Sequence, residues 1–173
     1  ILACDFEIIL LTETWLNKHI LSNELFSNNY NVFRKYREFT RGGGVLIAFD
    51  SKLNVEEITL SNPVSEIDIV ACKVQYHYDT FHIINLYIPP SIKPEKYQLI
   101  FDYMEQTINF QNITLIGGDF NIPHITTSGG FNTKSEEDTI LHNFLNFNDM
   151  YQHNNILNSK GRTLDLFITS NGV

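Results

Sequence analysis

The hydrophobic positions of the chain fall into short runs separated by polar or glycine-containing segments. Runs of this length and spacing are typical of buried or half-buried strands. They occupy residues 5–11, 45–49, 67–76, 80–88, 113–116 and 163–169. Three residues separate the runs 67–76 and 80–88, which predicts an antiparallel hairpin. The pattern therefore predicts a core built mainly from β-strands.

Two other segments carry the period of an amphipathic helix. Pro94 suits the first turn of a helix, and large apolar residues recur behind it at helical spacing up to Ile108. Ser135 precedes three acidic residues, which is typical of a capped helix start, and an apolar stripe follows to Phe147. Residues 16–26 form a loop or a short helix. This order of elements favours packed sheets flanked by helices over a doubly wound parallel sheet.

Composition places the chain among ordinary globular domains. It has 173 residues, of which 43% are hydrophobic and 18% charged, so we expect a single domain over residues 1–173. Cys4 and Cys72 have no metal-binding or disulfide spacing and are predicted to be reduced core residues. No apolar run is long enough to span a bilayer, and no secretory leader is evident. We therefore expect a soluble intracellular protein.

Charge is unevenly distributed along the chain. The net charge of -8 argues against a nonspecific nucleic-acid coat. Residues 33–41 nevertheless carry four basic residues against one acidic residue, with aromatic residues interleaved. Basic groups neutralise phosphates and aromatic faces stack on bases, so this segment is a candidate DNA-contacting edge; the alternative is a solvated strand edge guarded by charge. The basic residues are Arg34, Lys35, Arg37 and Arg41.

The segment 117–123 holds the strongest candidate chemistry, because it closes a buried strand with two glycines and an acid. Alternate residues of a strand share a side, so Asp119 and Asn121 are predicted to project together, with Phe120 facing the other way. The two glycines would let a substrate approach the backbone, and Pro123 would end the strand. The alternative is that Asp119 and Asn121 only form an Asx-type turn.

Other oxygen-bearing side chains follow or occupy predicted strands. Glu13 lies at a strand end, Asn85 and Tyr87 share a strand face, and Asp165 lies inside a strand on the face opposite the aliphatic residues. A carboxylate there is costly unless a hydrogen bond, a metal or a histidine accompanies it. Hard oxygen ligands select Mg2+ or Mn2+. Carboxylate-held Mg2+ suits phosphoester hydrolysis, in which a phenol or amide donates to the phosphoryl oxygens.

Five segments occur in an order that resembles a known family, the apurinic-type endonuclease domain of non-LTR (LINE-like) retrotransposons. This family lies within the endonuclease/exonuclease/phosphatase superfamily, and the resemblance covers essentially the whole chain. One segment alone is weak evidence, whereas five in register are specific. The segments are Leu-Thr-Glu-Thr-Trp-Leu at 11–16, Arg-Gly-Gly-Gly-Val at 41–45, Asn-Leu-Tyr-Ile-Pro-Pro at 85–90, Gly-Asp-Phe-Asn at 118–121 and Thr-Leu-Asp-Leu at 163–166.

The resemblance implies an α/β (α+β) fold, a four-layer α-β-β-α sandwich of two mixed sheets flanked by helices. It implies that Glu13 binds the metal and that Asp119, also near the metal, activates the attacking water or serves the leaving oxygen. It implies that Asn121 orients nucleophile and phosphate, that Tyr87 supports the pentavalent phosphate and that Asp165 orients a catalytic histidine. The implied activity is a nick in DNA that leaves a 3'-hydroxyl to prime reverse transcription.

The chain departs from the family pattern at both ends. Family members carry an opening strand with a phosphate-contacting asparagine and a closing Ser-Asp-His block, and neither is in this sequence. We therefore expect a fragment without its first and last strands, weak or inactive as a nuclease. Its six histidines are predicted to be surface or loop residues, with His124 nearest the site by sequence.

The expected partners follow from the same resemblance. They are DNA and a reverse transcriptase domain in the parent polypeptide, with action in the nucleus. Two other functions stay open on sequence alone. One is a non-catalytic remnant that binds DNA or protein, and the other is a phosphatase of the same superfamily.

Overall fold

The computed structural model describes residues 6–38, 41–90, 92–122, 125 and 135–170. Within these residues one sheet has three strands in the order β1-β3-β2. Both of its strand pairs are antiparallel. The strands are β1 (Ile8–Thr12), β2 (Tyr30–Lys35) and β3 (Val45–Asp50).

The second sheet has six strands in the order β4-β5-β6-β7-β9-β8. The pair β6–β7 is parallel and the other pairs are antiparallel. The parallel pair needs a crossover, and helix α2 (Pro94–Thr107) provides it. The strands are β4 (Asn54–Ile58), β5 (Asp68–Tyr76), β6 (Asp79–Tyr87), β7 (Ile113–Asp119), β8 (Met150–Gln152) and β9 (Asp165–Ser170).

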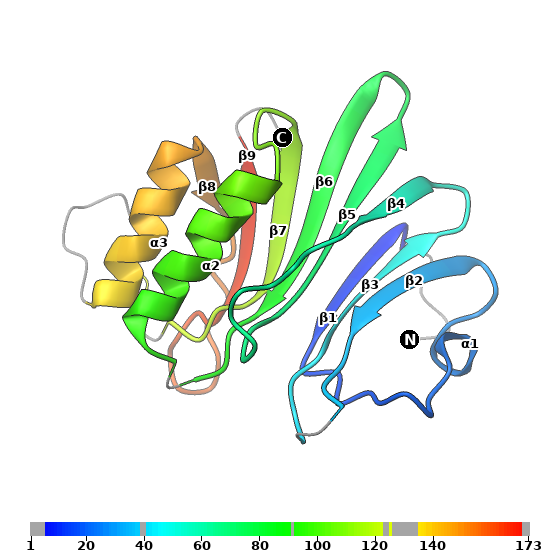
Figure 1. Ribbon diagram of the computed structural model, residues 1–173, viewed down its shortest axis with the longest axis horizontal. Coiled ribbons are helices and arrows are strands. Elements are labelled where there is room, and N and C mark those ends of the chain that lie inside the picture. Colours follow the sequence, from blue (N-terminus) through cyan, green and yellow to red (C-terminus); the bar gives the residue numbers. More distant parts are fainter. Residues whose placement is uncertain (1–5, 39–40, 91, 123–124, 126–134, 171–173) are drawn as a thin grey trace.

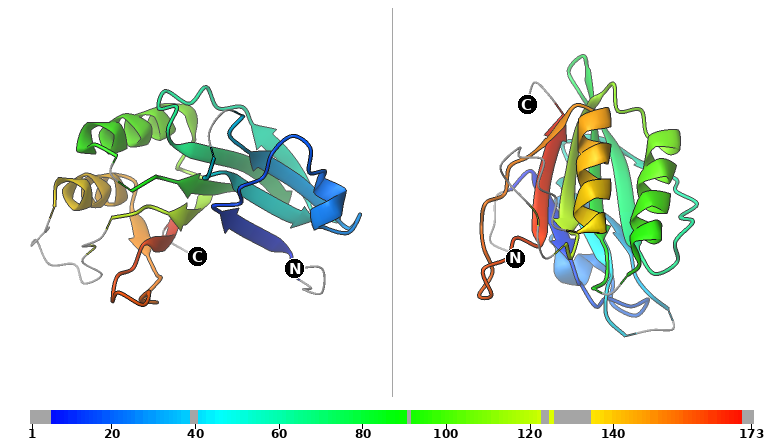
Figure 2. Two further views of the ribbon diagram at one scale, coloured as in Figure 1. Left: turned by 90° about the horizontal axis from the view of Figure 1, so that it is seen from below. Right: turned by 90° about the vertical axis from the view of Figure 1, so that its left-hand side faces the viewer.

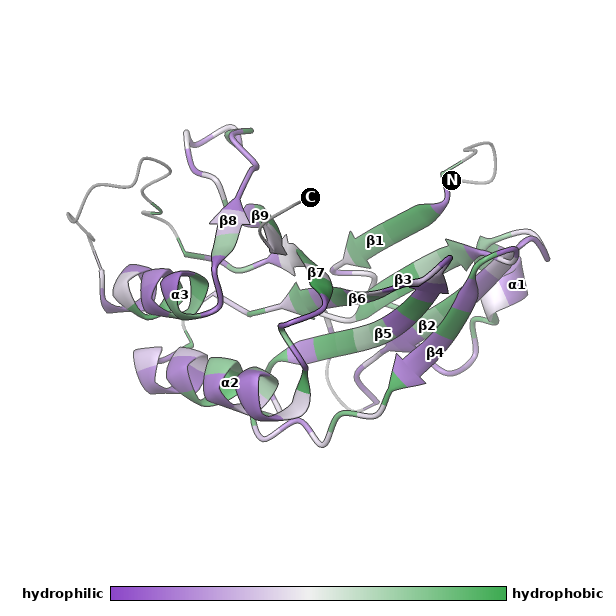
Figure 3. Ribbon diagram, turned by 90° about the horizontal axis from the view of Figure 1, so that it is seen from above, coloured by the Kyte–Doolittle hydropathy of each residue, from purple (hydrophilic) through white to green (hydrophobic). Residues whose placement is uncertain are grey.

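The six-stranded sheet is covered on both faces. Helices α2 and α3 (Glu136–Phe147) pack on one face, and the three-stranded sheet packs on the other (Figures 1 and 2). Alternation along the strands produces this arrangement. In β6, for example, Ile84 and Leu86 join the core beneath the helices, whereas Ile83 and Tyr87 join the core between the sheets. Figure 3 shows that the polar residues of α2 and α3 lie on the faces turned away from the sheet.

The outer face of the three-stranded sheet is covered by the one-turn helix α1 (Ser22–Leu25) and its flanking segments. Phe26 is buried there against Leu46 and Ala48 of β3. The four-layer sandwich predicted from the sequence is thus confirmed. One detail differs, because the smaller sheet is antiparallel rather than mixed in the described part of the chain.

Most predicted elements are present close to their expected bounds. The hairpin of β5 and β6 forms with Tyr76 opposite Asp79, α2 begins at Pro94, and the Ser135 side chain accepts a hydrogen bond from the Asp138 amide at 3.2 Å. Strands β2, β4 and β8 are not among the predicted runs. β2 lies at an edge of the smaller sheet, and β4 and β8 lie at the two edges of the larger sheet, where a strand needs few apolar residues to be held in place.

The structure also bears on the cysteines and on membrane insertion. Cys72 is a buried free thiol, as predicted, and burial raises its pKa to about 12. Cys4, Pro123, His124 and the loop 126–134 lie outside the described residues. In the part that is described, no helix is both long enough and apolar enough to cross a membrane.

Candidate active site

A row of polar side chains crosses four neighbouring strands of the larger sheet. Asp68 of β5 is opposite Tyr87 of β6, Tyr87 is opposite Asp119 of β7, and Asp119 is opposite Asp165 of β9. Residues paired in register present their side chains on the same face of a sheet. For this row it is the face that packs on the three-stranded sheet, because Tyr87 belongs to the core between the sheets.

Glu13 reaches the row from the other sheet. It directly follows β1, and its backbone has a φ of +48°. The Tyr87 hydroxyl donates a hydrogen bond to Glu13 Oε1 at 2.8 Å. The structure thus gathers Glu13, Tyr87, Asp119 and Asp165 where the two sheets meet, although they are far apart in the sequence.

Negative charge is concentrated at this point. Burial, opposed by the hydrogen bond from the Asn121 amide and reinforced by the charges of Asp165 and Glu13, raises the pKa of Asp119 to about 6. Burial and the charge of Glu13 also raise the pKa of Asp165. Burial and the hydrogen bond to Glu13 raise the pKa of the Tyr87 phenol far above 10. At neutral pH the Tyr87 phenol is therefore uncharged.

Asn121 both forms the Asx-type turn and belongs to the site. Its backbone N–H donates to Asp119 Oδ1 at 3.0 Å, and its Nδ2 donates to the Ile88 carbonyl at 2.9 Å. Its φ of +50° takes the chain out of the strand. Phe120 is buried on the opposite side, as predicted. The turn confirms the Asx-type alternative and fixes the orientation of the Asp119 carboxylate, and a catalytic part for the two residues stays a prediction.

Asn85, which a predicted substrate contact on the site face of β6 would place at the surface, lies in the interior of the fold. It is fully buried, and its Nδ2 donates to the carbonyls of Leu11 at 2.8 Å and Leu46 at 2.9 Å. These carbonyls belong to β1 and β3. Asn85 therefore joins the two sheets.

Arg37 is also engaged within the fold rather than free to track phosphates. Its Nε donates to Asp68 Oδ2 at 2.9 Å, and its guanidinium lies 5.6 Å from the centre of the Tyr87 ring. Asp68, which is 2% exposed, also accepts a hydrogen bond from the Gly44 amide at 2.9 Å. Arg37 is thus paired within the fold, and contact with DNA stays a prediction for it.

Asp68 is the site-supporting residue that the sequence did not reveal. It stands at the start of a predicted strand, where an acid is usually solvent-exposed. Only its register opposite Tyr87 and the approach of Arg37 from the other sheet show its position. Gly43 accommodates this contact, because a Cβ there would lie 2.6 Å from Asp68 Oδ2.

Asp165 differs from its prediction in one respect. It is the first residue of β9 instead of lying within the strand. Its side chain is exposed, so water solvates the carboxylate. No hydrogen bond or ion pair joins it to the described histidines. His82 was expected at the surface but is 5% exposed in β6.

The other basic residues lie on or next to strand β2, an edge of the smaller sheet. Lys35 is exposed, and the Arg34 guanidinium lies 5.5 Å from the centre of the Tyr36 ring. Arg41 lies 5.2 Å from the centre of the Trp15 ring. Unlike Arg37, these three side chains form no salt bridge within the described residues, so DNA contact remains a prediction for them.

The donor set fits a divalent cation held in part by water and substrate. Among the described residues, no three histidine, cysteine, aspartate or glutamate side chains converge closely enough to cage a metal. Mg2+, however, usually binds one or two carboxylates and keeps its remaining positions for water and phosphate. Glu13 and Asp119 meet that need, and no cation within the described residues neutralises them: burial and then the neighbouring acids raise the pKa of Asp119 and Asp165.

Fold and site together define a hydrolase of the nuclease and phosphatase type. The sequence profile of the Endonuclease/Exonuclease/phosphatase family matches residues 1–173, and the chain belongs to that family. Among curated protein sequences none matches the chain.

Solved structures of several activities share this fold. The endonuclease domain of TRAS1, a telomere-specific non-LTR retrotransposon, is 16% identical with a TM-score of 0.67, over 95% of this chain and 73% of that one. The Xenopus laevis APE2 catalytic domain is 15% identical with a TM-score of 0.66, over 96% and 74%. The Bacteroides thetaiotaomicron mannosyl-6-phosphatase Bt3783 is 15% identical with a TM-score of 0.60, over 97% and 72%. At such identities the likeness shows a shared fold.

Proposed function

We propose that this chain is the catalytic domain of a non-LTR retrotransposon endonuclease, which hydrolyses a DNA phosphodiester with Mg2+ or Mn2+ and leaves a 3'-hydroxyl. The observation that carries the proposal is the meeting of Glu13, Tyr87, Asp119 and Asp165 where the two sheets join. The five sequence segments that resemble that endonuclease family supply the preference for DNA. On this proposal the domain acts in the nucleus and is joined to a reverse transcriptase in the parent polypeptide.

Each side chain has a chemical part in the proposed reaction. Asp119 has a pKa of about 6, close to the working pH, which suits it to accept a proton from the attacking water. To donate to a phosphoryl oxygen, the neutral Tyr87 hydroxyl turns its single proton away from Glu13 Oε1, which accepts it in this structure. Glu13 and Asp119 hold the cation, which when bound offsets charge on the phosphoryl oxygens. The backbone amide of Asn121 holds the Asp119 carboxylate in place.

The basic residues at the edge favour DNA over a small phosphorylated molecule. Arg34, Lys35 and Arg41 lie close together in the sequence, on or next to one edge strand, in a chain whose net charge is -8. A phosphorylated sugar needs only the site itself, whereas a DNA strand extends beyond it and meets further cations.

The test is a nicking assay on supercoiled plasmid with Mg2+. The expected result is weak nicking, seen as slow formation of relaxed circles whose 3' ends a polymerase extends without prior treatment, and Asp119→Asn should abolish it. Release of phosphate from a sugar phosphate, measured in parallel, tests the phosphatase alternative. Folded protein that leaves the plasmid intact at every divalent cation tried would overturn the proposal.

A further inference from the structure

Trp15 is the single tryptophan of the sequence, and it is 54% exposed. It follows Glu13 by two residues, so its ring is carried on the same loop as the candidate metal ligand. An exposed indole adds apolar surface that folding does not bury. Aromatic side chains at such positions are typical of binding sites for flat ligands.

The backbone holds this indole in a strained conformation. Trp15 has a φ of +53°, in the left-handed region that bulky residues rarely adopt. Its N–H donates to the Gly43 carbonyl at 3.0 Å, and the N–H of Thr14 donates to the Gly44 carbonyl at 3.2 Å. Gly44 is required here, since a Cβ would lie 2.6 Å from Thr14 Oγ1. Strain maintained by two hydrogen bonds points to a functional position for the ring.

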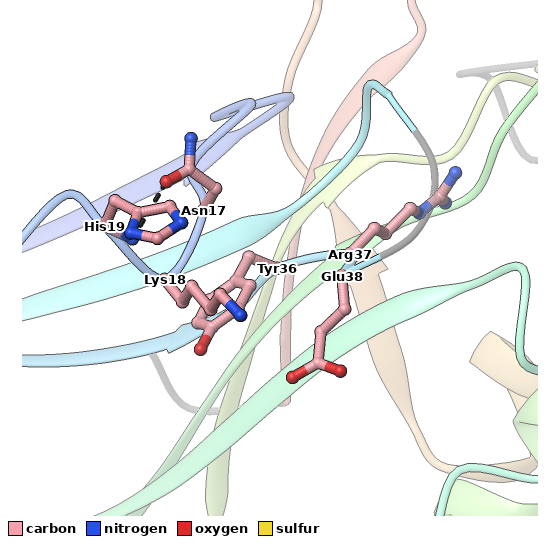
Figure 4. Close-up of a pocket in the computed structure, with 6 residues that line it drawn as sticks. All are labelled: Asn17, Lys18, His19, Tyr36, Arg37 and Glu38. Atoms are coloured by element: carbon pink, nitrogen blue, oxygen red, sulfur yellow. Dashed lines mark hydrogen bonds between the residues drawn. The ribbon is translucent and has the colours of Figure 1, made fainter.

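A cation and a polar pocket accompany the indole. The Arg41 guanidinium lies 5.2 Å from the centre of the Trp15 ring, within cation–π distance. The residues that follow on the same loop, 17–19, line a pocket of about 230 Å³ together with residues 36–38 (Figure 4). Lys18 lies in this pocket beside Tyr36, whereas Arg37 points away from the other lining side chains (Figure 4). Two aromatic residues, Trp15 and Tyr36, and two cations, Lys18 and Arg41, thus lie on adjoining loops.

We propose that Trp15 and Arg41 form a stacking platform for an unpaired DNA base next to the cleaved phosphate, with Lys18 and Tyr36 receiving the adjoining nucleotide. The proposal rests on the proposed nuclease function and adds to it a preference for unpaired DNA. Aromatic rings stack on any base, and a guanidinium both stacks and pairs with phosphate. If instead the Trp15–Arg41 pair only closed the two loops together, its loss would change stability and not binding.

Because Trp15 is the only tryptophan, its fluorescence reports on the platform directly. The probe is a single-stranded oligonucleotide of about ten nucleotides, titrated in EDTA so that no cleavage occurs. We expect saturable quenching of the fluorescence and a matching rise in anisotropy of the labelled strand. A strand of equal length with abasic sites keeps the phosphates, and it should quench much less. A fully paired duplex of the same length should also quench less.

Variants separate stacking from folding. Trp15→Ala should weaken binding of the single strand on the order of tenfold or more, while Trp15→Phe, which keeps a ring, retains most of it. The matched control is Tyr78→Ala. Tyr78 is fully exposed in the β5–β6 turn and directly precedes β6, so it lies at the far end of that strand from Tyr87. It should leave binding unchanged. Arg41→Gln should weaken binding and lower its salt dependence.

The outcomes distinguish this proposal from the nuclease function. Equal binding by wild type and Trp15→Ala, or equal quenching by abasic and normal strands, would overturn the platform even if the plasmid is nicked. If the folded wild type neither binds any of these strands nor nicks the plasmid, both proposals are wrong. Nicking that persists in Tyr78→Ala and falls in Trp15→Ala, together with the binding measured by anisotropy of the labelled strand, supports both.

Discussion

Asp119 of β7 and Asp165 of β9 are direct partners in an antiparallel strand pair. Two carboxylates in this position repel each other, and Asp119 is partly buried, so the pair lowers the stability of the fold. Such a cost persists at sites where the charge is used, which is the usual conflict between stability and activity. A phosphate-bound cation would relieve the repulsion.

Asp119→Asn should therefore stabilise the metal-free protein near neutral pH. The pKa of Asp119 is raised from 3.8 to about 6, so its contribution to stability is complete below about pH 4 and is lost as pH rises through 6. The asparagine variant should be more stable at pH 7.5 by at most about 3 kcal/mol, and the gap should close near pH 4. Urea denaturation in EDTA at both pH values measures this. Asp79→Asn, at the exposed hairpin, is the control, and a gap independent of pH would contradict the prediction.

Glu13→Gln should remove the response of the fold to divalent cations. A ligand that binds only the native state raises the midpoint of thermal unfolding in a saturable manner. We expect Mg2+ or Mn2+ to do so for the wild type and hardly at all for the variant. The amide keeps the size of the side chain and still accepts the hydrogen bond of Tyr87, so the fold is preserved. Glu57→Gln on the exposed edge strand β4 is the control. If the cation raises the unfolding midpoint equally in Glu13→Gln and wild type, Glu13 does not bind the metal.

Asp68→Asn should weaken catalysis although Asp68 touches no substrate. It holds Arg37 against the Tyr87 ring, so its loss releases the guanidinium and frees the phenol to move. On the proposed reaction, kcat should fall by about tenfold with little change in KM, since Tyr87 acts on the transition state. Stability should fall by about 2 kcal/mol, because Asp68 is buried while Arg37 is partly exposed. The control is Lys96→Ala, which breaks an exposed pair with Glu66 and should change stability much less than Asp68→Asn. Unchanged kcat in Asp68→Asn would show that Arg37 does not position Tyr87.

The sequence predicted the strands that carry the site because the site lies at the ends of apolar runs. Asp119 follows a buried run, and Tyr87 shares its strand face with Ile83, so period and spacing suffice to place both. The segments whose placement was missed are polar edge strands such as β4, where the neighbouring strand rather than the local sequence imposes the extended form.

The observed structural roles of Asn85, Arg37 and Asp68 could not be predicted from the sequence, for a related reason. Each depends on which group from the other sheet lies opposite, and sequence periodicity gives the direction of a side chain but not its partner. An arginine in a basic segment looks like a phosphate contact until a buried acid is found beside it. Asn85 on the site face of β6 likewise looks accessible until the carbonyls of β1 and β3 are placed over it.

Substitution of Gly118 tests why two glycines precede Asp119. The sequence suggested that these glycines admit a substrate, but a Cβ on Gly118 would lie 1.9 Å from the Leu86 carbonyl oxygen of the neighbouring strand, at a φ of +147°. Gly118→Ala must therefore push β7 away from β6, and we expect it to destabilise the fold by more than about 3 kcal/mol. Gly161→Ala is the matched control: its φ is +71° and a Cβ there would meet nothing within 4 Å, so only the backbone conformation opposes it, at about 1 kcal/mol. Urea denaturation of the two variants gives the comparison. Equal and small losses would mean that the strands adjust to the methyl group, and the glycine would then be explained by access to the site and not by the packing of β7 on β6.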